Sequence, residues 1–369
     1  MERGCVRDDP HPRHNGGSGD QEAEDTVSDA GFEPGRIRLA RELNGWSQTE
    51  LARRVDLSAA AVSQFEIGVT RPSAESLRDV AGALHMPESF FSLPLVETHE
   101  GFFRSLRRSS VTDRRRARAL AQLAHDLADL DTASVLPAVT VPEQARLALD
   151  ATTEEIEAEA LRVRKAWGLP AGPVHDVVGV MESHGIVVIR LPLDSADVDA
   201  FSLPFADRPV VVLASDKADR ARSRFDAAHE LAHLVLHGEQ VWGLPEVEKQ
   251  AHAFAAAFLM PRDDISGELP PRADWPVLFA LKQRWQVSIA ALLMRARTLG
   301  RMSETSYLTA MKMVSARGWR RSEPVPLGPP EEPRLLSALV EGREHELAEA
   351  LPIETIQALV GATAGVAHG

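Results

Sequence analysis

The chain has 369 residues, of which 44% are hydrophobic and 26% charged, and its formal net charge is -13 at pH 7. This length allows two or three globular domains, and no apolar run approaches a membrane span, so no membrane partner is expected. The net acidic charge excludes indiscriminate attraction to nucleic acid, although local charge can differ.

The N-terminal segment carries no sign of secretion. It has no apolar stretch of the kind found in signal peptides, and the single cysteine, Cys5, cannot form a disulfide within the chain. Both features predict a cytoplasmic protein. Residues 1–33 are rich in Gly, Asp, Glu and His and contain almost no large apolar side chains. Such a segment cannot bury enough surface to offset its chain entropy, so we predict a disordered acidic tail.

Residues 34–93 have the pattern of a compact all-α domain. Apolar residues recur at helical spacing, and Ser47 with Glu50 forms a capping box that opens a second helix. Ser58 caps a third helix, which Gly68 ends. Two short helices around a four-residue turn, backed by further helices, predict a helix-turn-helix.

Within this domain, Trp46–Val55 and Val62–Gly68 are similar to the XRE-type (Cro/repressor-like) helix-turn-helix domains. The resemblance implies binding to a double-stranded DNA operator, with the helix that follows Ser58 in the major groove and a homodimer on a two-fold site. The alternative is a helical bundle that makes only protein contacts. The expected phosphate contacts are Gln48, Arg53, Arg54 and Arg71, and the expected groove-facing residues are Ser58, Ala59, Ala60, Ser63 and Gln64. Alanine donates no hydrogen bond, so base readout depends on Gln64 and the two serines.

Residues 94–141 are predicted to be an arginine-rich linker and an amphipathic helix. Arginines crowd residues 104–118, and Leu120, Leu123, Leu127 and Leu130 form one stripe. One interpretation is an arginine arm that contacts DNA phosphates. The other is a helix whose face packs on the domain that follows.

Residues 142–323 are predicted to form an α+β domain. Helices over Glu154–Trp167 and Val174–His184 lead into a strand over Gly185–Leu191, and a second strand is predicted over Val210–Leu213. Both strands are short and β-branched, so we expect them to pair in a small sheet. The backbone of a bound peptide could extend an edge strand of such a sheet.

The segment Phe225–His237 contains no Pro or Gly, is rich in Ala and Leu, and is followed by Gly238, which predicts a helix. Residues four apart share a helix face, so the imidazoles of His229 and His233 can converge on one ion. Glu230 lies one step round the helix, where its carboxylate can reach a water molecule at the metal. This is the H-E-x-x-H zinc arrangement of two ligands and a general base.

A second helix, which begins at Val247 and ends at Pro261, offers the carboxylate of Glu248 as a third ligand. A His₂Glu set leaves the fourth zinc position open, as catalysis requires. The alternative is a helix that carries two unrelated histidines. The carboxylate on the second helix favours a metal site.

The two segments Phe225-x-x-x-His-Glu-Leu-x-His-x-x-x-His237 and Glu248-x-x-Ala-x-x-Phe-Ala-x-x-Phe-Leu-Met-Pro261 resemble the ImmA/IrrE metallo-endopeptidases. Val198–Ser202 and Arg208–Leu213 fit the same pattern. The resemblance implies a zincin-like domain, with Zn²⁺ held by His229, His233 and Glu248 and with Glu230 as the base. Fused members of the family have a similar Phe-Arg-Ser-Leu-Arg entry, which favours the packed interpretation of residues 94–141.

Two positions depart from the family pattern. Ala232 stands where the family usually has Gly, and His252 where it usually has Asn or Asp. His252 lies one turn after Glu248 and could orient a ligand or hydrogen-bond the tetrahedral intermediate. His237 is expected to be a helix-end or supporting group rather than a ligand.

The resemblance to fused regulators extends to Tyr307–Arg320 and to Glu323 and Pro324. Residues 324–333 are predicted to be a proline-rich linker, and residues 334–369 a C-terminal region of two or three short amphipathic helices. The expected fold class is therefore mostly α with a small β-sheet (α+β). It combines an all-α helix-turn-helix domain, a zincin-like metallopeptidase domain and a helical C-terminal region.

The sequence predicts a DNA-binding transcriptional regulator with a zinc-dependent endopeptidase domain that hydrolyses peptide bonds of a protein target. The target implied by the resemblance is a helix-turn-helix repressor or the chain itself. The alternative is a non-catalytic regulator, or an antitoxin-type repressor, whose zinc domain senses a ligand or partner. The intact set of His229, Glu230, His233 and Glu248 favours the enzyme, because pure sensing has no need of Glu230.

Overall fold

The computed structural model describes residues 31–96, 98, 110–131, 135–145, 147–193, 199–216, 218–237 and 244–361. Residues 1–31 and 32–369 form separate units, and the second unit contains every element described below. Residues 1–30 of the predicted tail and the arginines at 104, 107 and 108 lie outside the described residues. Within these ranges, no helix has the length and apolar character required to span a membrane.

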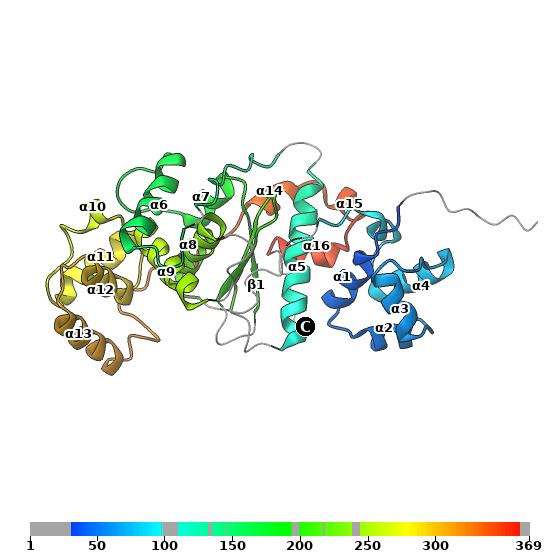
Figure 1. Ribbon diagram of the computed structural model, residues 1–369, viewed down its shortest axis with the longest axis horizontal. Helices are drawn as coiled ribbons and strands as arrows, with labels where there is room; N and C mark the ends of the chain where they lie inside the picture. The colour runs from blue at the N-terminus through cyan, green and yellow to red at the C-terminus, as the bar shows by residue number, and fades with distance from the viewer. Residues whose placement is uncertain are drawn as a thin grey trace, which may run out of the picture. The chain divides into compact units, whose positions relative to one another are not determined.

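The N-terminal domain consists of helices α1 (Gly35–Leu43), α2 (Gln48–Arg54), α3 (Ala59–Glu66) and α4 (Ala74–Leu84) and the 3₁₀-helix η1 (Glu88–Ser92) (Figure 1). Their inward-facing apolar side chains form one core. Helices α2 and α3 are separated by four residues, which is the predicted helix-turn-helix spacing.

Serine caps explain where three of these helices begin. Ser47, Ser58 and Ser73 each accept a hydrogen bond from the backbone N–H three residues further along the chain. Ser47 and Glu50 form the predicted capping box. In the turn between α2 and α3, Asp56 adopts a left-handed conformation with φ of 50°. Short polar side chains tolerate this conformation, which lets the chain reverse quickly.

Helix α5 (Val111–Asp129) contacts both α1 and the sheet of the following domain. Leu123 and Leu127 are fully buried on its apolar stripe. Arg36 of α1 forms a buried ion pair with Asp126 of α5. The described part of this region therefore follows the packed interpretation, and α5 joins the helix-turn-helix domain to the sheet.

The sheet has three strands in the order β1-β3-β2: β1 (Val187–Leu191), β2 (Ala200–Leu203) and β3 (Val210–Ala214). Strand β1 is parallel to β3, with Val187 opposite Val210, whereas β2 is antiparallel to β3. The predicted pairing of β1 with β3 is confirmed. Strand β2 was not predicted, because its Ala-Phe-Ser-Leu sequence lacks the β-branched residues that indicated the other two strands.

Both faces of the sheet are covered, so alternate residues enter different cores. On β1, Val187 and Ile189 pack with α5 and the C-terminal helices, whereas Val188 packs with the core of the following helices. Helices α7 (Val177–Ser183) and α8 (Arg220–Leu236) cover this second face (Figure 1). This burial on both sides accounts for the continuous apolar run of the central strand β3.

Helix α8 packs most extensively against α9 (Pro245–Leu259), which also contacts α6 (Thr153–Ala166). The chain continues through four more helices, which extend the same core. They are α10 (Arg262–Ile265), α11 (Trp275–Trp285), α12 (Ile289–Thr298) and α13 (Glu304–Ala316).

Several predicted boundaries differ from the structure by a few residues, among them the start of α8 at Arg220 rather than Phe225, and two of the differences have a clear local cause. Helix α7 begins at Val177 rather than Val174, because Asp176 caps it by accepting a hydrogen bond from the N–H of Gly179. The first strand begins at Val187 rather than Gly185. Gly185 has φ of 81°, and a Cβ there would lie 2.7 Å from the backbone of Val139, so this residue forms a tight turn that only glycine suits.

The C-terminal region forms three short helices, α14 (Leu335–Val340), α15 (Glu344–Leu347) and α16 (Ile353–Leu359), as the sequence predicted. The proline-rich segment before them is more than a spacer. Its Glu331 is buried, accepts hydrogen bonds of 2.8 and 3.1 Å from the first two N–H groups of α7, and forms an ion pair with Arg224 of α8. This carboxylate anchors the C-terminal region to the domain that carries the zinc motif.

Candidate metal centre and DNA-binding surface

Helix α8 positions the residues of the H-E-x-x-H motif. Asp219 caps its start by accepting a hydrogen bond from the N–H of Arg222, and the helix ends where His237 adopts an extended conformation. Between these ends the helix is mostly buried against the sheet and α9. This burial fixes the direction in which His229 and His233 point.

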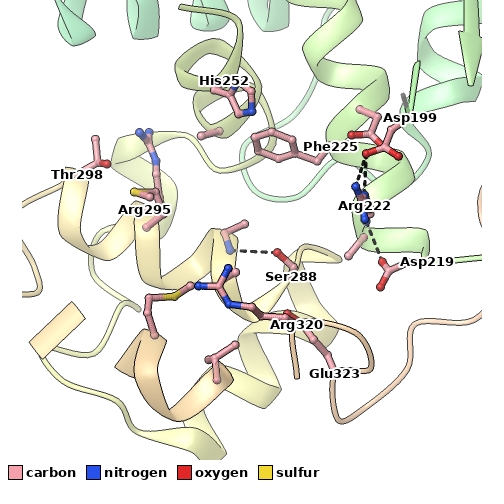
Figure 2. Close-up of a pocket in the computed structure, with 18 of the residues that line it drawn as sticks. Asp199, Asp219, Arg222, Phe225, His252, Ser288, Arg295, Thr298, Arg320 and Glu323 are labelled. Carbon is pink, nitrogen blue, oxygen red and sulfur yellow. Dashed lines mark hydrogen bonds and ion pairs between the residues drawn. The ribbon is translucent and has the colours of Figure 1, made fainter. Parts of the chain in front are cut away.

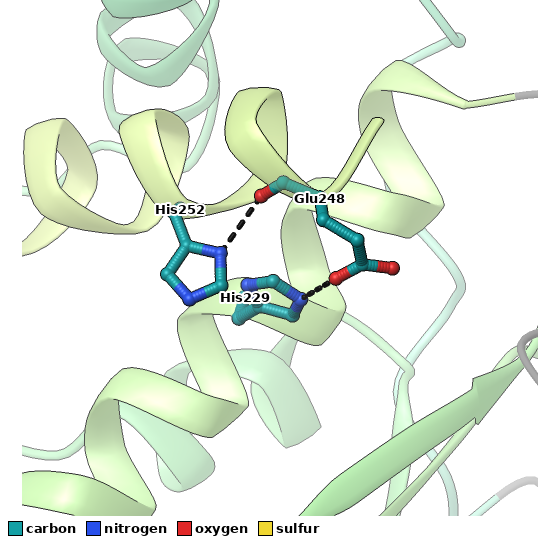
Figure 3. A group of neighbouring side chains, drawn as sticks. All are labelled: His229, Glu248 and His252. Atoms are coloured by element: carbon teal, nitrogen blue, oxygen red, sulfur yellow. Dashed lines mark hydrogen bonds and ion pairs between the residues drawn. The ribbon is translucent and has the colours of Figure 1, made fainter. Parts of the chain in front are cut away.

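The predicted ligand atoms converge between α8 and α9. His229 Nε2 lies 3.1 Å from His233 Nε2 and 3.2 Å from Glu248 Oε2, and His233 Nε2 lies 3.9 Å from Glu248 Oε1. Figure 3 shows His229 and Glu248 facing each other from the two helices. In a tetrahedral zinc site with bonds of about 2.0–2.1 Å, ligand atoms lie about 3.3 Å apart. The three donors therefore fit one zinc ion.

The protonation of the two histidines differs, because their surroundings shift their pKa values in opposite directions. Burial holds the pKa of His233 well below its ordinary range, so its imidazole is neutral, as a metal ligand must be. Burial also acts to lower the pKa of His229, but the hydrogen bond and charge of Glu248 raise it overall. Burial acts to raise the pKa of Glu248, but the hydrogen bond and charge of His229 outweigh burial, so the pKa of Glu248 is lowered overall. Glu248 and His229 together thus provide a negatively charged oxygen donor and an imidazole nitrogen donor.

Glu230 is buried next to these residues, and one of its carboxylate oxygens lies within 4.8 Å of a ring nitrogen of His229 and of His233. Its Oε2 accepts a hydrogen bond of 2.8 Å from Ser202 Oγ on β2, which is itself fully buried. Burial raises the pKa of Glu230 to about 7, although His229 and the Ser202 hydroxyl act against this rise. A carboxylate with a pKa near neutrality can both accept and return a proton.

His237 supports His233 from the far side of the site. His237 Nδ1 lies 3.0 Å from His233 Nδ1, and His237 Nε2 lies 3.1 Å from Gln250 Oε1. Gln250 is buried on α9, and its amide nitrogen donates to the Ala148 carbonyl at 2.7 Å. Gln250 was not among the predicted site residues. The available signal was a polar residue on the buried face of α9, beside Val247, Ala251 and Phe254.

His252 lies next to the ligand set. Its Nδ1 donates a hydrogen bond of 2.7 Å to the Glu248 carbonyl, and its ring is edge-on to that of His229, with 4.5 Å between centroids (Figure 3). His229, Glu248 and His252 together each offer a donor atom within 4.8 Å of the others. This contact with the backbone of Glu248 agrees with a role in orienting a ligand.

The residues predicted at base edges lie on and just before α3. Ser58, Ala60 and Gln64 are exposed, whereas Ala59 and Ser63 are half-buried. The Ser58 hydroxyl also accepts the capping hydrogen bond from Ala61 N. Gln64 is therefore the exposed side chain with the most hydrogen-bonding capacity on this helix.

The predicted phosphate-binding residues differ in their surroundings. Arg53, Arg54 and Arg71 are exposed, and the Arg54 guanidinium lies 3.8 Å from the ring centre of Trp46. Gln48 instead donates a hydrogen bond of 2.8 Å to Glu66 Oε2. Glu66 is buried and holds Arg41 through two further hydrogen bonds, so Gln48 belongs to a network that joins α1, α2 and α3.

Two family models match the chain. Residues 37–91, which span α1 to η1, match a model described as a helix-turn-helix, and residues 181–297 match a model described as an IrrE N-terminal-like domain, a peptidase family. The second match covers the sheet and the two helices that carry the predicted metal ligands. No curated protein matches the chain. The chain thus joins an XRE-type helix-turn-helix domain to a domain of the ImmA/IrrE type.

Proposed function

We propose that this fusion protein is a transcriptional regulator that binds an operator and hydrolyses peptide bonds of a protein target to control gene expression. One observation supports the proposal: a buried carboxylate, Glu230, lies next to His229, which converges with His233 and Glu248, and we assign it the role of proton acceptor rather than ligand. A domain that only binds a metal has no use for this fourth group. A hydrolase requires it as a proton acceptor.

The residues that would hold Zn²⁺ are His229, His233 and Glu248. When bound, Zn²⁺ supplies Lewis-acid chemistry, which polarises a carbonyl and activates water near neutral pH. Ser202 Oγ fixes Oε2 of Glu230, which leaves Oε1 to take a proton from the attacking water. Glu230 then gives this proton to the leaving amine, and its pKa of about 7 suits both transfers.

The sheet supplies a means of holding the substrate. Strand β2 has one neighbour, β3, in the described part of the sheet, and its Ser202 contacts the proposed base. A peptide that adds to this strand would run beside Glu230 and the ligands. Main-chain hydrogen bonds to such a strand are the same for many peptide sequences. Selection among peptide side chains must therefore come from other residues of the site.

The DNA-binding proposal rests on the helix-turn-helix match and on the exposure of α3. We propose that α3 enters the major groove of a double-stranded operator and that a homodimer binds a two-fold symmetric site. Exposed Arg53, Arg54 and Arg71 provide positive charge for phosphates although the whole chain is acidic.

The direct test is to incubate the purified, zinc-loaded full chain with candidate helix-turn-helix repressors, and with the chain alone. Fragments are identified by mass spectrometry, with Glu230→Gln protein in parallel. Fragments that require Glu230 support the peptidase, whether the target is a repressor or the chain itself. If no target is cleaved while zinc-ligand variants lose regulation and Glu230→Gln does not, the chain is a non-catalytic or antitoxin-type regulator.

A further inference from the structure

A cavity of about 850 Å³ adjoins the metal ligands. Glu248 and His252 of α9 line it, and it extends towards α12, α13 and the segment that follows α13. Figure 2 shows His252 at one end and Arg320 at the other, with Phe225 between them. A volume of this size accommodates more than one side chain of a bound peptide.

Much of the cavity wall is apolar. Its long apolar side chains come from α8, α12, α13 and the turn after α13, and alanines of α9 and α12 leave space between them. These residues are Phe225, Ala253, Ala256, Ala291, Met294, Met311, Val314 and Trp319. Flexible methionines and aromatic rings of this kind bind large apolar groups well.

The acidic side chains that line the cavity are largely committed to protein partners. Asp199 is paired with Arg222, and Asp219 caps α8. Glu323 accepts hydrogen bonds from Lys282 Nζ at 2.8 Å and from the N–H of Ile289 at 3.0 Å. Asp199 and Glu323 are thus each paired with a cation, Glu248 is paired with His229, and Asp219 is held by a backbone hydrogen bond.

The positive charges of two arginines in the same wall are not compensated by ion pairs with carboxylates of the described residues. Arg320 and Arg321 are exposed, and neither forms an ion pair with a carboxylate in the described part of the chain. Arg320 Nε donates to the Ser315 hydroxyl at 2.7 Å, which leaves its terminal nitrogens for another acceptor. The remaining charge at this end of the cavity is therefore positive, in a chain whose net charge is -13.

A third arginine has an unused donor. Arg295 lines the cavity and is 2% exposed; its Nε donates to the Met260 carbonyl at 3.0 Å, and its Nη1 pairs with Glu157. Its Nη2 is buried and has no hydrogen-bond partner among the described residues. A buried donor without a partner is rare, and because this nitrogen has almost no accessible surface, an occupant would reach it only after a local shift of the cavity wall.

We propose that this cavity selects the substrate: it takes a peptide segment with a large apolar side chain next to the scissile bond and acidic side chains that reach Arg320 and Arg321. This inference rests on the proposed peptidase function. The apolar wall begins beside Glu248, the predicted ligand that lines the cavity, so the apolar side chain lies closest to the reacting bond. The arginines at the far end then bind carboxylates through charge-assisted hydrogen bonds.

The test measures binding separately from cleavage. The probes are short fluorescein-labelled peptides of Gly and Ala with one central Phe that is flanked on both sides by Glu. Matched peptides replace the Phe by Ala, or each Glu by Lys. Fluorescence polarisation with zinc-loaded Glu230→Gln chain, which is not expected to cleave them, should show about tenfold weaker binding for either replacement.

Variants of the chain test whether the cavity residues cause the preference for Phe and Glu in the peptide. The double variant Arg320→Glu/Arg321→Glu should lose the preference for Glu over Lys or reverse it, whereas Arg301→Glu, an exposed charge outside the cavity, should leave it unchanged. Ala291→Trp, which fills the cavity, should weaken binding of the Phe peptide about tenfold. Because the two exposed arginines contribute little to folding, the double variant stays informative even if Ala291→Trp does not fold.

Three results would overturn the inference, and two of them come from the binding assay. One is equal binding of the Glu and Lys peptides; the other is an Arg320→Glu/Arg321→Glu variant that keeps the original preference. A different result would contradict the proposed peptidase function itself. A non-catalytic chain would cleave no peptide from a proteome-derived library, yet it would still bind the Phe–Glu probes. Cleavage at sites with no apolar or acidic bias would contradict the substrate assignment and leave the peptidase intact.

Discussion

His233 Nδ1 and His237 Nδ1, one turn apart at the C-terminal end of α8, lie 3.0 Å from each other. This contact determines which nitrogen of His233 faces the other two predicted ligands. The amide nitrogen of Gln250 donates to Ala148, so its Oε1 must accept from His237 Nε2. Burial lowers the pKa of His237 to about 4, so its ring is neutral and its Nδ1 is an acceptor. His233 Nδ1 therefore donates to His237, and the lone pair of its Nε2 is directed at the site.

This arrangement predicts that Gln250 supports metal binding without touching the metal. Gln250→Leu should lower zinc affinity by about 10–100-fold, because His237 and then His233 lose their fixed orientation. Competition with a chelator measures the affinity. Gln283→Leu, an exposed substitution on α11, is the control and should have no effect. Equal affinities for the two variants would show that the hydrogen-bonded chain does not position the ligand.

The ligand set predicts about one Zn²⁺ per chain, measured by elemental analysis after dialysis. His233→Ala and Glu248→Ala should each reduce zinc retention sharply, because each removes a direct ligand. His252→Ala should keep the metal, since its Nδ1 contacts the carbonyl of Glu248 rather than a ligand atom. If Glu248→Ala retains zinc and His252→Ala does not, the third ligand is His252.

Glu230→Gln should separate catalysis from metal binding. The amide has nearly the same shape as the carboxylate and can still accept the hydrogen bond from Ser202, but it cannot take a proton. Cleavage of the target should fall by about 10²–10⁴-fold, while zinc content, thermal stability and operator binding stay unchanged. Derepression in cells is the second readout. Normal derepression in this variant would contradict a proteolytic switch.

For the DNA-binding surface, Gln64→Ala should weaken binding to the specific operator by about 1–3 kcal/mol, because Gln64 is the exposed amide on α3. Binding to unrelated DNA should change little, since Gln64 carries no charge. Gel-shift titrations on both DNAs measure this, with Glu75→Ala, an exposed residue of α4, as control. Unchanged operator affinity in Gln64→Ala would mean that α3 does not read bases through this residue.

The anchor formed by Glu331 predicts a large stability effect from a segment that is rich in proline. Glu331→Ala leaves Arg224 buried without its partner and should lower the free energy of unfolding by about 3–5 kcal/mol. The neighbouring Glu332 has a side chain that is 67% exposed, so Glu332→Ala should change stability by only about 0.5 kcal/mol or less. Urea denaturation of both variants tests this, and equal midpoints would exclude the anchor.

The sequence by itself determined the features that depend on local spacing. Ser47 and Glu50 gave the start of α2, and the positions of His229 and His233 gave two imidazoles on one helix face. Such features follow from the helical repeat and from capping, which act over three or four residues. The mostly helical fold class was predictable for the same reason, whereas the two domain types were predicted from the resemblance of the motifs to known families.

Tertiary structure alone decided the contacts between residues that are distant in the chain. Ser202 reaches Glu230 because β2 pairs antiparallel with β3 beside α8, and Gln250 reaches His237 because α9 packs on α8. Glu331 meets Arg224 across more than a hundred residues. No periodicity encodes these contacts, because they depend on strand register, on the path of each loop and on the burial that makes an unpaired polar group costly.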